Sequence, residues 1–425
     1  MVKLKGTITI LADKSVSHRA IIFGALSKGE FEIKNLSLGQ DCLNTLKIFS
    51  KLGMKYEFLS KNHLKINSTE LFNNLKDDFV FDCGNSGTTT RLLMGLFSSI
   101  ENLKCTLVGD DSLSKRPMKR VIEPLNLMGA EIEHNDYKLP IKIKGKKLKG
   151  IEYFSPVASA QVKSCLILAG LNADGSTKIY ENTLSRNHSE IMLEYLNCPI
   201  KTGKDEKGYF VEVEKNSLTS KDIEVVGDIS SAAFFMVAAA IVPNSRVLIK
   251  NVGLNPTRTG IIDIFKQAEV DFKILNERKV SNELMGDIEV NYTKNIKPFE
   301  IKGDIIPRLI DEIPILAILA SQANGKSIVK DAKDLRNKES DRISTIVEAF
   351  KKLDINIVEN EDGFIIEGKK DINKDVFLKT HLDHRLAMSY YVLSLINKGK
   401  TEIEDMSCIN TSFPEFLDMM GILKD

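Results

Sequence analysis

The chain has 425 residues, enough for two or three domains that each bury a core of their own. Its 59 basic and 58 acidic residues give a formal net charge of +1, which excludes the basic footprint of a general nucleic-acid binder and the acidic excess of a disordered chain. The six cysteines form no CxxC pair and have no histidine partners at ligand spacing, so we expect reduced thiols and no zinc site. The apolar stretch at the N-terminus is too short for a signal sequence, and no run of about 18 apolar residues occurs. We therefore expect a cytoplasmic protein that binds neither membranes nor nucleic acid.

Six segments of similar plan follow one another along the chain. Each opens on a short polar or glycine-containing turn, enters an apolar helix, passes a strand, and continues through a second, amphipathic helix to another strand. The openings begin near residues 13, 84, 158, 228, 311 and 383, at intervals of about 71, 74, 70, 83 and 72 residues. This regularity predicts an α/β protein built from six copies of one unit.

Capping residues mark the expected start of the first helix in each unit. Asp, Asn and Ser side chains accept hydrogen bonds from the free N–H groups of a first helical turn. In chain order, the expected caps are Asp13, Asn85, Ser159, Asp228, Asp311 and Asp383. Apolar side chains at helical spacing predict second helices over residues 43–52 and 343–353, and a strand follows the latter at 355–358.

Basic side chains gather in or beside these openings. A single cation of this kind is most often a solvated surface charge, but recurrence at equivalent places in repeats favours function. Helix N-termini carry free N–H groups and about half a positive charge, so several of them together with Lys and Arg bind multiply charged anions such as phosphates and carboxylates. The cations concerned are Lys14, Arg19, Arg91, Arg116, Lys163, Arg186, Lys338, Arg342 and Arg385.

Two acidic residues in this basic setting are candidates for proton transfer. Asp311 precedes an apolar helix and Glu339 stands between Lys338 and Arg342, so their ordinary roles would be a helix cap and an ion pair. A carboxylate within reach of a reacting proton serves as a general acid or base. His188 and His384 are expected to be structural.

Six short motifs occur in order along the chain. They are Lys14-Ser15-Val16-Ser17-His18-Arg19, Gly84-Asn85-Ser86-Gly87-Thr88, Arg116-Pro117-Met118, Ser159-Ala160-Gln161-Val162-Lys163, Lys338-Glu339-Ser340-Asp341-Arg342 and Asp383-His384-Arg385. Together they resemble the 3-phosphoshikimate 1-carboxyvinyltransferase (EPSP synthase) family, and the resemblance extends from about Ile8 to Met420, including the segment from Thr411 to Phe416.

The resemblance implies a two-domain, inside-out α/β barrel of six βαβαββ units, three per domain, with helices inside and sheets outside. One domain would comprise residues 1–12 and 226–425, and the other residues 13–225. The active site would lie in the cleft between the domains, with a hinge near residues 12–13 and 225–227.

The resemblance also implies the reaction. The 5-hydroxyl of shikimate 3-phosphate attacks C2 of phosphoenolpyruvate and C3 is protonated. Phosphate then leaves the tetrahedral intermediate as C3 loses a proton, which gives 5-enolpyruvylshikimate 3-phosphate in the shikimate pathway of aromatic amino acid biosynthesis. No metal or organic cofactor is implied. The expected partners are these two small molecules alone, and the expected protein is a monomer.

The site residues follow from the motifs position by position. Asp311 is the implied acceptor of the hydroxyl proton, and Glu339 with Lys14 is the implied proton donor or relay. The implied contacts of shikimate 3-phosphate are Lys14, Ser15, Arg19, Ser159, Ala160, Gln161, Ser185, Arg186, Asp311 and Lys338. The implied contacts of phosphoenolpyruvate are Lys14, Asn85, Gly87, Arg116, Gln161, Arg342 and Arg385.

Gly87 also implies sensitivity to an inhibitor. In the family, glycine at this position accompanies inhibition by glyphosate, which competes with phosphoenolpyruvate, whereas alanine gives tolerance. The sequence departs from the family pattern in two places: Leu11-Ala12 replace a Pro-Gly pair of many members, and Thr411 replaces a lysine of some.

Two alternatives remain at this point. A UDP-N-acetylglucosamine enolpyruvyl transferase would share the fold, but it carries a reactive cysteine before its Arg-Pro motif, where residues 109–115 here contain none. A non-catalytic protein that binds a phosphorylated metabolite would not require Lys14, Asp311 and Glu339 together.

Overall fold

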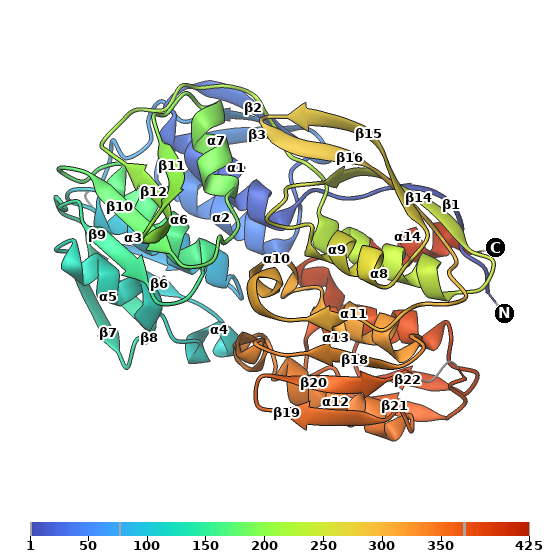
Figure 1. Cartoon of the computed structure of the whole chain (residues 1–425). Helices are drawn as coiled ribbons and strands as arrows, with labels where there is room; N and C mark the ends of the chain where they lie inside the picture. Colours follow the sequence, from blue (N-terminus) through green and yellow to red (C-terminus); the bar gives the residue numbers. More distant parts are fainter. Residues whose placement is uncertain (1, 76–77, 369–370, 425) are drawn as a thin grey trace. The chain divides into compact units, whose positions relative to one another are not determined.

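The computed structural model describes residues 2–75, 78–368 and 371–424 (Figure 1). The chain divides into two compact units. Unit 1 comprises Met1–Leu11, Val226–Lys279 and Leu284–Asp425, and unit 2 comprises Ala12–Val225 with the short segment Val280–Glu283.

Unit 2 contains three successive repeats. The first has α1 (Lys14–Leu26), β2 (Glu30–Lys34), α2 (Gln40–Lys51), β3 (Lys55–Ser60) and β4 (His63–Asn67). The second has β5 (Asp78–Asp82), α3 (Gly87–Ser98), β6 (Lys104–Val108), α4 (Asp111–Lys115), α5 (Lys119–Leu127), β7 (Glu131–Asn135) and β8 (Lys138–Lys144). The third has β9 (Glu152–Ser155), α6 (Ala160–Gly170), β10 (Thr177–Glu181), α7 (His188–Tyr195), β11 (Lys201–Asp205) and β12 (Gly208–Val213), and β13 (Ile223–Glu224) follows it.

Unit 1 contains the other three repeats. The fourth has β1 (Lys5–Thr9), α8 (Ile229–Ile241), β14 (Arg246–Gly253), α9 (Gly260–Gln267), β15 (Phe272–Val280) and β16 (Glu283–Asn291). The fifth has β17 (Glu300–Ile301), η1 (Gly303–Ile305), α10 (Ile306–Leu309), α11 (Ile313–Ser321), β18 (Lys326–Val329), η2 (Lys333–Asn337), α12 (Arg342–Lys352), β19 (Ile357–Asn360) and β20 (Gly363–Glu367). The sixth has β21 (Val376–Leu378), α13 (His384–Ser394), β22 (Thr401–Ile403), η3 (Ser407–Thr411) and α14 (Phe416–Leu423).

Each of the first five repeats forms one four-stranded sheet with the same topology. In the third repeat, for example, the order is β11-β12-β10-β9, with β9 parallel to β10 and the other pairs antiparallel. The leading strand of the first repeat is supplied by β13, parallel to β2, and that of the fourth by β1, parallel to β14. The predicted α/β class and the βαβαββ repeat are confirmed. The sixth repeat departs from the plan, because a two-stranded sheet is followed by η3 and α14.

The first helix of each repeat lies in the interior of its own unit. Helix α3 packs on α6 in unit 2, and α11 packs on α8 and α13 in unit 1. These helices are apolar almost all the way round, which is what a helix surrounded by protein requires. The N-termini of these helices carry several of the candidate site residues, among them Lys14, Gly87 and Ala160.

Two of the expected caps are wrong. Helix α3 is capped by Ser86, whose hydroxyl accepts from Thr89 N at 3.1 Å, because α3 begins at Gly87, one residue later than a cap at Asn85 would require. Helix α11 begins at Ile313 after Glu312 and has no side-chain cap hydrogen bond, which leaves the Asp311 carboxylate to other partners. The expected caps Asp13, Ser159, Asp228 and Asp383 are confirmed by their hydrogen bonds to the first helical turn.

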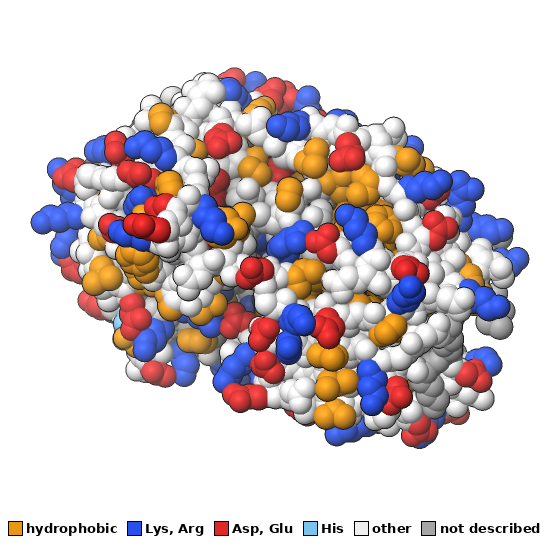
Figure 2. Space-filling model, viewed as in Figure 1, with side chains coloured by type: hydrophobic (Ala, Val, Ile, Leu, Met, Phe, Trp, Pro, Cys, Tyr) orange, Lys and Arg blue, Asp and Glu red, His pale blue; other side chains and the backbone are white. Residues whose placement is uncertain are grey.

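The surface carries both charge signs. Figure 2 shows Lys and Arg side chains interspersed with Asp and Glu over the visible face. Within the residues that the structure describes, no helix combines the length and apolar character needed to span a bilayer.

Candidate functional site

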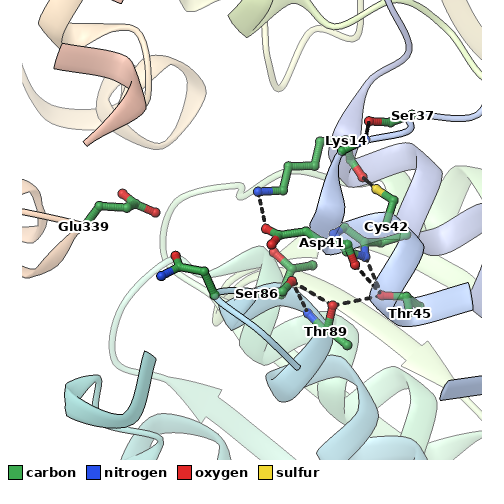
Figure 3. Close-up of polar contacts among 12 residues, drawn as sticks. Lys14, Ser37, Asp41, Cys42, Thr45, Ser86, Thr89 and Glu339 are labelled. Carbon is green, nitrogen blue, oxygen red and sulfur yellow. Dashed lines mark hydrogen bonds and ion pairs between the residues drawn. The ribbon is translucent and has the colours of Figure 1, made fainter. Parts of the chain in front are cut away.

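Lys14, the first residue of α1, forms an ion pair with Asp41 in the first turn of α2 (Figure 3). The Asp41 side chain is buried, whereas Lys14 keeps 28% of its side chain exposed. A fixed carboxylate restricts the rotamers of a long flexible side chain, so Asp41 holds the ammonium in place while one face of it stays open.

A chain of hydrogen bonds through hydroxyl groups links α1, α2 and α3 behind Lys14 (Figure 3). The Thr45 hydroxyl lies 2.9 Å from His18 Nδ1 and 2.8 Å from the Thr89 hydroxyl, which donates in turn to the Ser86 hydroxyl at 2.7 Å. Burial lowers the pKa of His18 to about 3, with Lys14 and Arg19 adding to the effect against Asp41. His18 is therefore a neutral link in this network.

The loop before α3 is held by two neighbouring side chains. Asn85 donates to Asp110 at 2.7 Å and accepts from Arg116 Nη2 at 3.0 Å, so Arg116 is tied to the same loop as Gly87. A Cβ at Gly87 would lie 2.8 Å from Arg91 Nη1 and 3.7 Å from Arg116 Nη1. Glycine thus allows two guanidinium groups to approach the helix N-terminus.

Gln161, in the first turn of α6, has both ends of its amide engaged. Its Oε1 accepts from Arg91 Nη1 at 2.7 Å, and its Nε2 donates to the Thr88 hydroxyl at 3.0 Å. Arg91 and Thr88 lie on α3, so the packing of α3 on α6 fixes the orientation of Gln161.

Arg19 lies inside unit 2, with only 2% of its surface exposed. It donates to the carbonyl oxygen of Ser15 at 2.9 Å and to the hydroxyls of Ser164 and Ser189 at 2.7 and 2.8 Å. Burial lowers its pKa to about 10, with Glu190 opposing the shift, so the guanidinium stays charged at neutral pH. In this structure Arg19 supports the backbone of Ser15 from behind.

The start of α6 and the loop after β10 meet at one buried carboxylate. Glu181 accepts from the Ser185 hydroxyl at 2.6 Å and from the backbone N–H of Ser159 at 3.2 Å. Lys163 pairs with Glu181 at 2.9 Å and with Glu190 at 2.8 Å. Ala160 is the first residue of α6 and the half-buried Arg186 follows Ser185, so the expected phosphate contacts of the third repeat are neighbours.

A second group of candidates lies in unit 1 around Asp311. One carboxylate oxygen of Asp311 is 3.5 Å from Lys338 Nζ and 3.7 Å from Arg342 Nη1. Glu339 pairs with Arg342 Nη2 at 2.7 Å, and Arg385 Nη1 donates to the carbonyl oxygen of Asp311 at 3.3 Å. All five expected site residues of unit 1 therefore form one cluster.

Arg342 is the buried centre of this cluster. Its Nε donates to Asp383 at 2.8 Å, and Asp383 also caps α13 by accepting from Arg385 N. Burial alone would lower the pKa of Arg342, but the carboxylates of Asp383, Glu339 and Asp311 raise it above its usual value. A permanently charged guanidinium held in this way is suited to an anionic guest.

Sequence reasoning missed four interactions of the site: Asp41 with Lys14, Arg91 with Gln161, Glu181 with its serines, and Asp383 with Arg342. Three of these involve carboxylates that orient cations or hydroxyls rather than touch a guest. The available signal was the position of Asp41 in a first helical turn and of Glu181 at the end of a strand.

The chemistry of both groups suits anions rather than metal ions. Within residues 2–75, 78–368 and 371–424, His, Cys, Asp and Glu form no group of three that could hold a metal. Cations, hydroxyls and helix N-termini instead recur around two carboxylates, and such groups bind phosphates and carboxylates.

The fold is that of the enolpyruvyl transferases. The crystal structure of the enolpyruvyl transferase NikO from Streptomyces tendae matches with a TM-score of 0.78 at 13% identity, over 100% of this chain and 96% of that one. An EPSP synthase structure from Acinetobacter baumannii matches with a TM-score of 0.87 at 38% identity, over 99% of this chain and 96% of that one.

The chain belongs to the EPSP synthase (3-phosphoshikimate 1-carboxyvinyltransferase) family, whose model matches residues 1–420. It is 45% identical to the 3-phosphoshikimate 1-carboxyvinyltransferases of Thermoanaerobacter sp. (strain X514) and of Bacillus cytotoxicus, over 425 and 423 residues. Each alignment covers 99% of this chain and 98% of the relative. The resemblance inferred from the six motifs is confirmed.

Proposed function

We propose that this chain transfers the enolpyruvyl group of phosphoenolpyruvate to the 5-hydroxyl of shikimate 3-phosphate, with release of phosphate, and that its own residues in both units supply the binding and proton-transfer groups. The family membership supports the reaction. The two substrates are anions, and the difficult steps are proton transfers and stabilisation of developing charge.

Asp311 is the proposed acceptor of the hydroxyl proton. The observation that carries this role is its position 3.5 Å from Lys338 and 3.7 Å from Arg342, with no helix to cap. A carboxylate within reach of a hydroxyl accepts its proton as a general base, and Lys338 and Arg342 hold the carboxylate of Asp311 in place. Glu339 and Lys14 are the proposed donors or relays of the proton that reaches C3.

The remaining candidates are proposed to bind the substrates. Lys14 would contact both anions, with its ammonium oriented by Asp41. The proposed shikimate 3-phosphate contacts are Lys14, Ser15, Arg19, Ser159, Ala160, Gln161, Ser185, Arg186, Asp311 and Lys338. The proposed phosphoenolpyruvate contacts are Lys14, Asn85, Gly87, Arg116, Gln161, Arg342 and Arg385.

The reactive cysteine of a UDP-N-acetylglucosamine enolpyruvyl transferase has no counterpart that supports the same chemistry here. Cys105 lies buried on β6, and burial raises the pKa of its thiol to about 12. A thiol that stays protonated at neutral pH is a poor nucleophile and a poor acid. The residues at 109–115, which include α4, contain no cysteine.

The test is phosphate release on mixing the protein with both substrates. We expect stoichiometric release only when shikimate 3-phosphate and phosphoenolpyruvate are present together, and no release when UDP-N-acetylglucosamine replaces the former. Activity should be unchanged by a metal chelator. Absence of release with the first pair, in a protein whose thermal unfolding shows it to be folded, would refute the proposal.

A further inference from the structure

Glu181 is the meeting point of four hydrogen-bond donors. Its Oε1 accepts from the Ser185 hydroxyl at 2.6 Å and from Ser159 N at 3.2 Å. Its Oε2 accepts from Lys163 Nζ at 2.9 Å and from Ser185 N at 3.3 Å. Both backbone segments that carry the proposed phosphate-binding serines of the third repeat are therefore tied to one side chain, which is 3% exposed.

The loop that Glu181 holds has little structure of its own. Residues 182–187 lie between β10 and α7 without helix or strand hydrogen bonding. Lys163 adds one further restraint, because its ammonium lies 3.4 Å from the Ser185 carbonyl oxygen. A loop whose conformation is fixed mainly by side chains loses that conformation when the side chains change.

The charges around Glu181 balance locally. Burial alone would lower the pKa of Lys163, but Glu190 and Glu181 raise it, so the ammonium stays charged. The buried Arg19 interacts electrostatically with Glu190 and adds a second cation beside these two carboxylates. A buried carboxylate placed next to an anion site would repel the guest if it were not neutralised in this way. The arrangement thus gives the serines a rigid support without adding net negative charge.

We propose that Glu181, neutralised by Lys163, is a positioning residue for shikimate 3-phosphate: it orders Ser159 and the Ser185-Arg186 loop before the phosphate arrives. This rests on the proposed function of those residues. Among the described residues, Glu181 makes no hydrogen bond to a proposed phosphoenolpyruvate contact. The expected consequence is an effect on one substrate only.

The variant that isolates this role is Glu181→Gln, which keeps the size of the side chain and removes its charge. Glu181, Lys163 and Glu190 also line a cavity of about 320 Å³, so the amide has space to adjust. We expect the KM for shikimate 3-phosphate to rise about tenfold to a hundredfold, because the loop loses charge-assisted hydrogen bonds, and the KM for phosphoenolpyruvate and kcat at saturation to change less than about threefold.

Two further variants complete the experiment. Glu181→Asp keeps the charge on a shorter side chain and should give an intermediate KM for shikimate 3-phosphate. Glu152→Gln makes the same change at an exposed position on the adjacent strand β9, in a surface pair with Lys207, and should behave as wild type.

Each outcome of this experiment supports or overturns the positioning role of Glu181. Equal rises in both KM values, or an unchanged KM for shikimate 3-phosphate in folded Glu181→Gln, would overturn the positioning role. If the glutamine variant does not fold, the ratio of the two KM values in Glu181→Asp decides in the same way. A wild type that releases no phosphate from the two substrates would instead refute the proposed function, so the two failures are distinguishable.

Discussion

The ammonium of Lys14 and the buried carboxylate of Asp41 form an ion pair between the first turns of α1 and α2. Asp41 is 4% exposed, so the carboxylate of the pair is fixed inside the protein, whereas the lysine side chain reaches the surface. This arrangement orients the ammonium of a lysine that would otherwise be flexible. Removal of the carboxylate should therefore affect binding more than the loss of one exposed surface ion pair would.

Asp41→Asn tests that orientation. We expect kcat/KM to fall about 10- to 100-fold for both substrates, because Lys14 loses its charged anchor, with a small change in thermal stability. Steady-state kinetics with each substrate varied in turn provide the measurement. Asp136→Asn, which alters an exposed pair with Lys138, is the matched control. Wild-type kinetics in the Asp41 variant would show that Lys14 does not need the anchor.

Substitutions of Lys14 separate charge from proton transfer. Lys14→Met should lower kcat about 10²- to 10³-fold and lower the binding affinity for both substrates. Lys14→Arg should restore binding more than turnover, because a guanidinium does not release its proton readily. Turnover and binding are measured separately by single-turnover kinetics and equilibrium binding. An arginine variant as fast as wild type would leave Lys14 only an electrostatic role.

Asp311→Asn tests the proposed base. The amide keeps the shape of the side chain beside Lys338 and Arg342 but cannot take a proton, so we expect kcat to fall about 10²- to 10⁴-fold with both substrates still bound. Phosphate release measures the loss. Asp371→Asn, in an exposed pair with Lys398, controls for a charge change in the same unit. Near-normal turnover would remove Asp311 from the mechanism.

Gly87→Ala should alter inhibition by glyphosate more than use of phosphoenolpyruvate. A Cβ at Gly87 would lie 2.8 Å from Arg91 Nη1, so Arg91 must shift. The methyl group also takes up space beside the ligand, which the longer inhibitor needs more than the substrate does. We expect the ratio of the inhibition constant to the phosphoenolpyruvate KM to rise about tenfold or more. Gly421→Ala, where no atom lies within 4 Å of the new Cβ, is the control. An unchanged ratio would show that Gly87 serves only the backbone turn before α3.

His18 makes stability depend on pH. Burial lowers its pKa from 6.5 to about 3, so below pH 6.5 the unfolded chain binds a proton that the folded chain does not. Stability must then fall with decreasing pH, by about 1.4 kcal/mol per pH unit and about 2 kcal/mol by about pH 5. His18→Asn should remove this part of the pH dependence and can keep the hydrogen bond to Thr45. Urea unfolding at pH 5 and pH 7.5 measures the free energy of unfolding of both proteins. An equal loss of stability between the two pH values in wild type and His18→Asn would contradict the role of His18.

The repeat and most helix starts could be predicted from the sequence because they depend on local signals. Asp13, Ser159, Asp228 and Asp383 each act on the helix that follows directly, and the apolar helices need only a buried face. The error at Asp311 has a local origin as well, since a carboxylate before an apolar helix has the pattern of a cap whether or not its side chain turns to other partners.

The partners that support the site could not be predicted because each contact joins separate elements of the fold. Asp383 meets Arg342 across 41 positions, and Gln161 meets Arg91 across 70. Such pairs depend on how separate helices pack, which apolar periodicity does not specify. Glu181 illustrates the limit: four donors reach it, and only the packed structure shows that they converge.

The pairing of β1 with β14 sets an order for folding during synthesis. Leu4 and Ser245, which hydrogen-bond beside this strand pair, are separated by 241 residues, so at about 5–20 residues per second the strand waits about 12 to 48 seconds for its neighbour. Nearly all of unit 2 leaves the ribosome in that interval and can complete its three sheets first. Four of the five β1 residues are exposed even after pairing, and the strand contains lysine, glycine and threonine. A short polar strand of this kind is a poor template for aggregation, so the segment can remain unpaired safely until unit 1 is made.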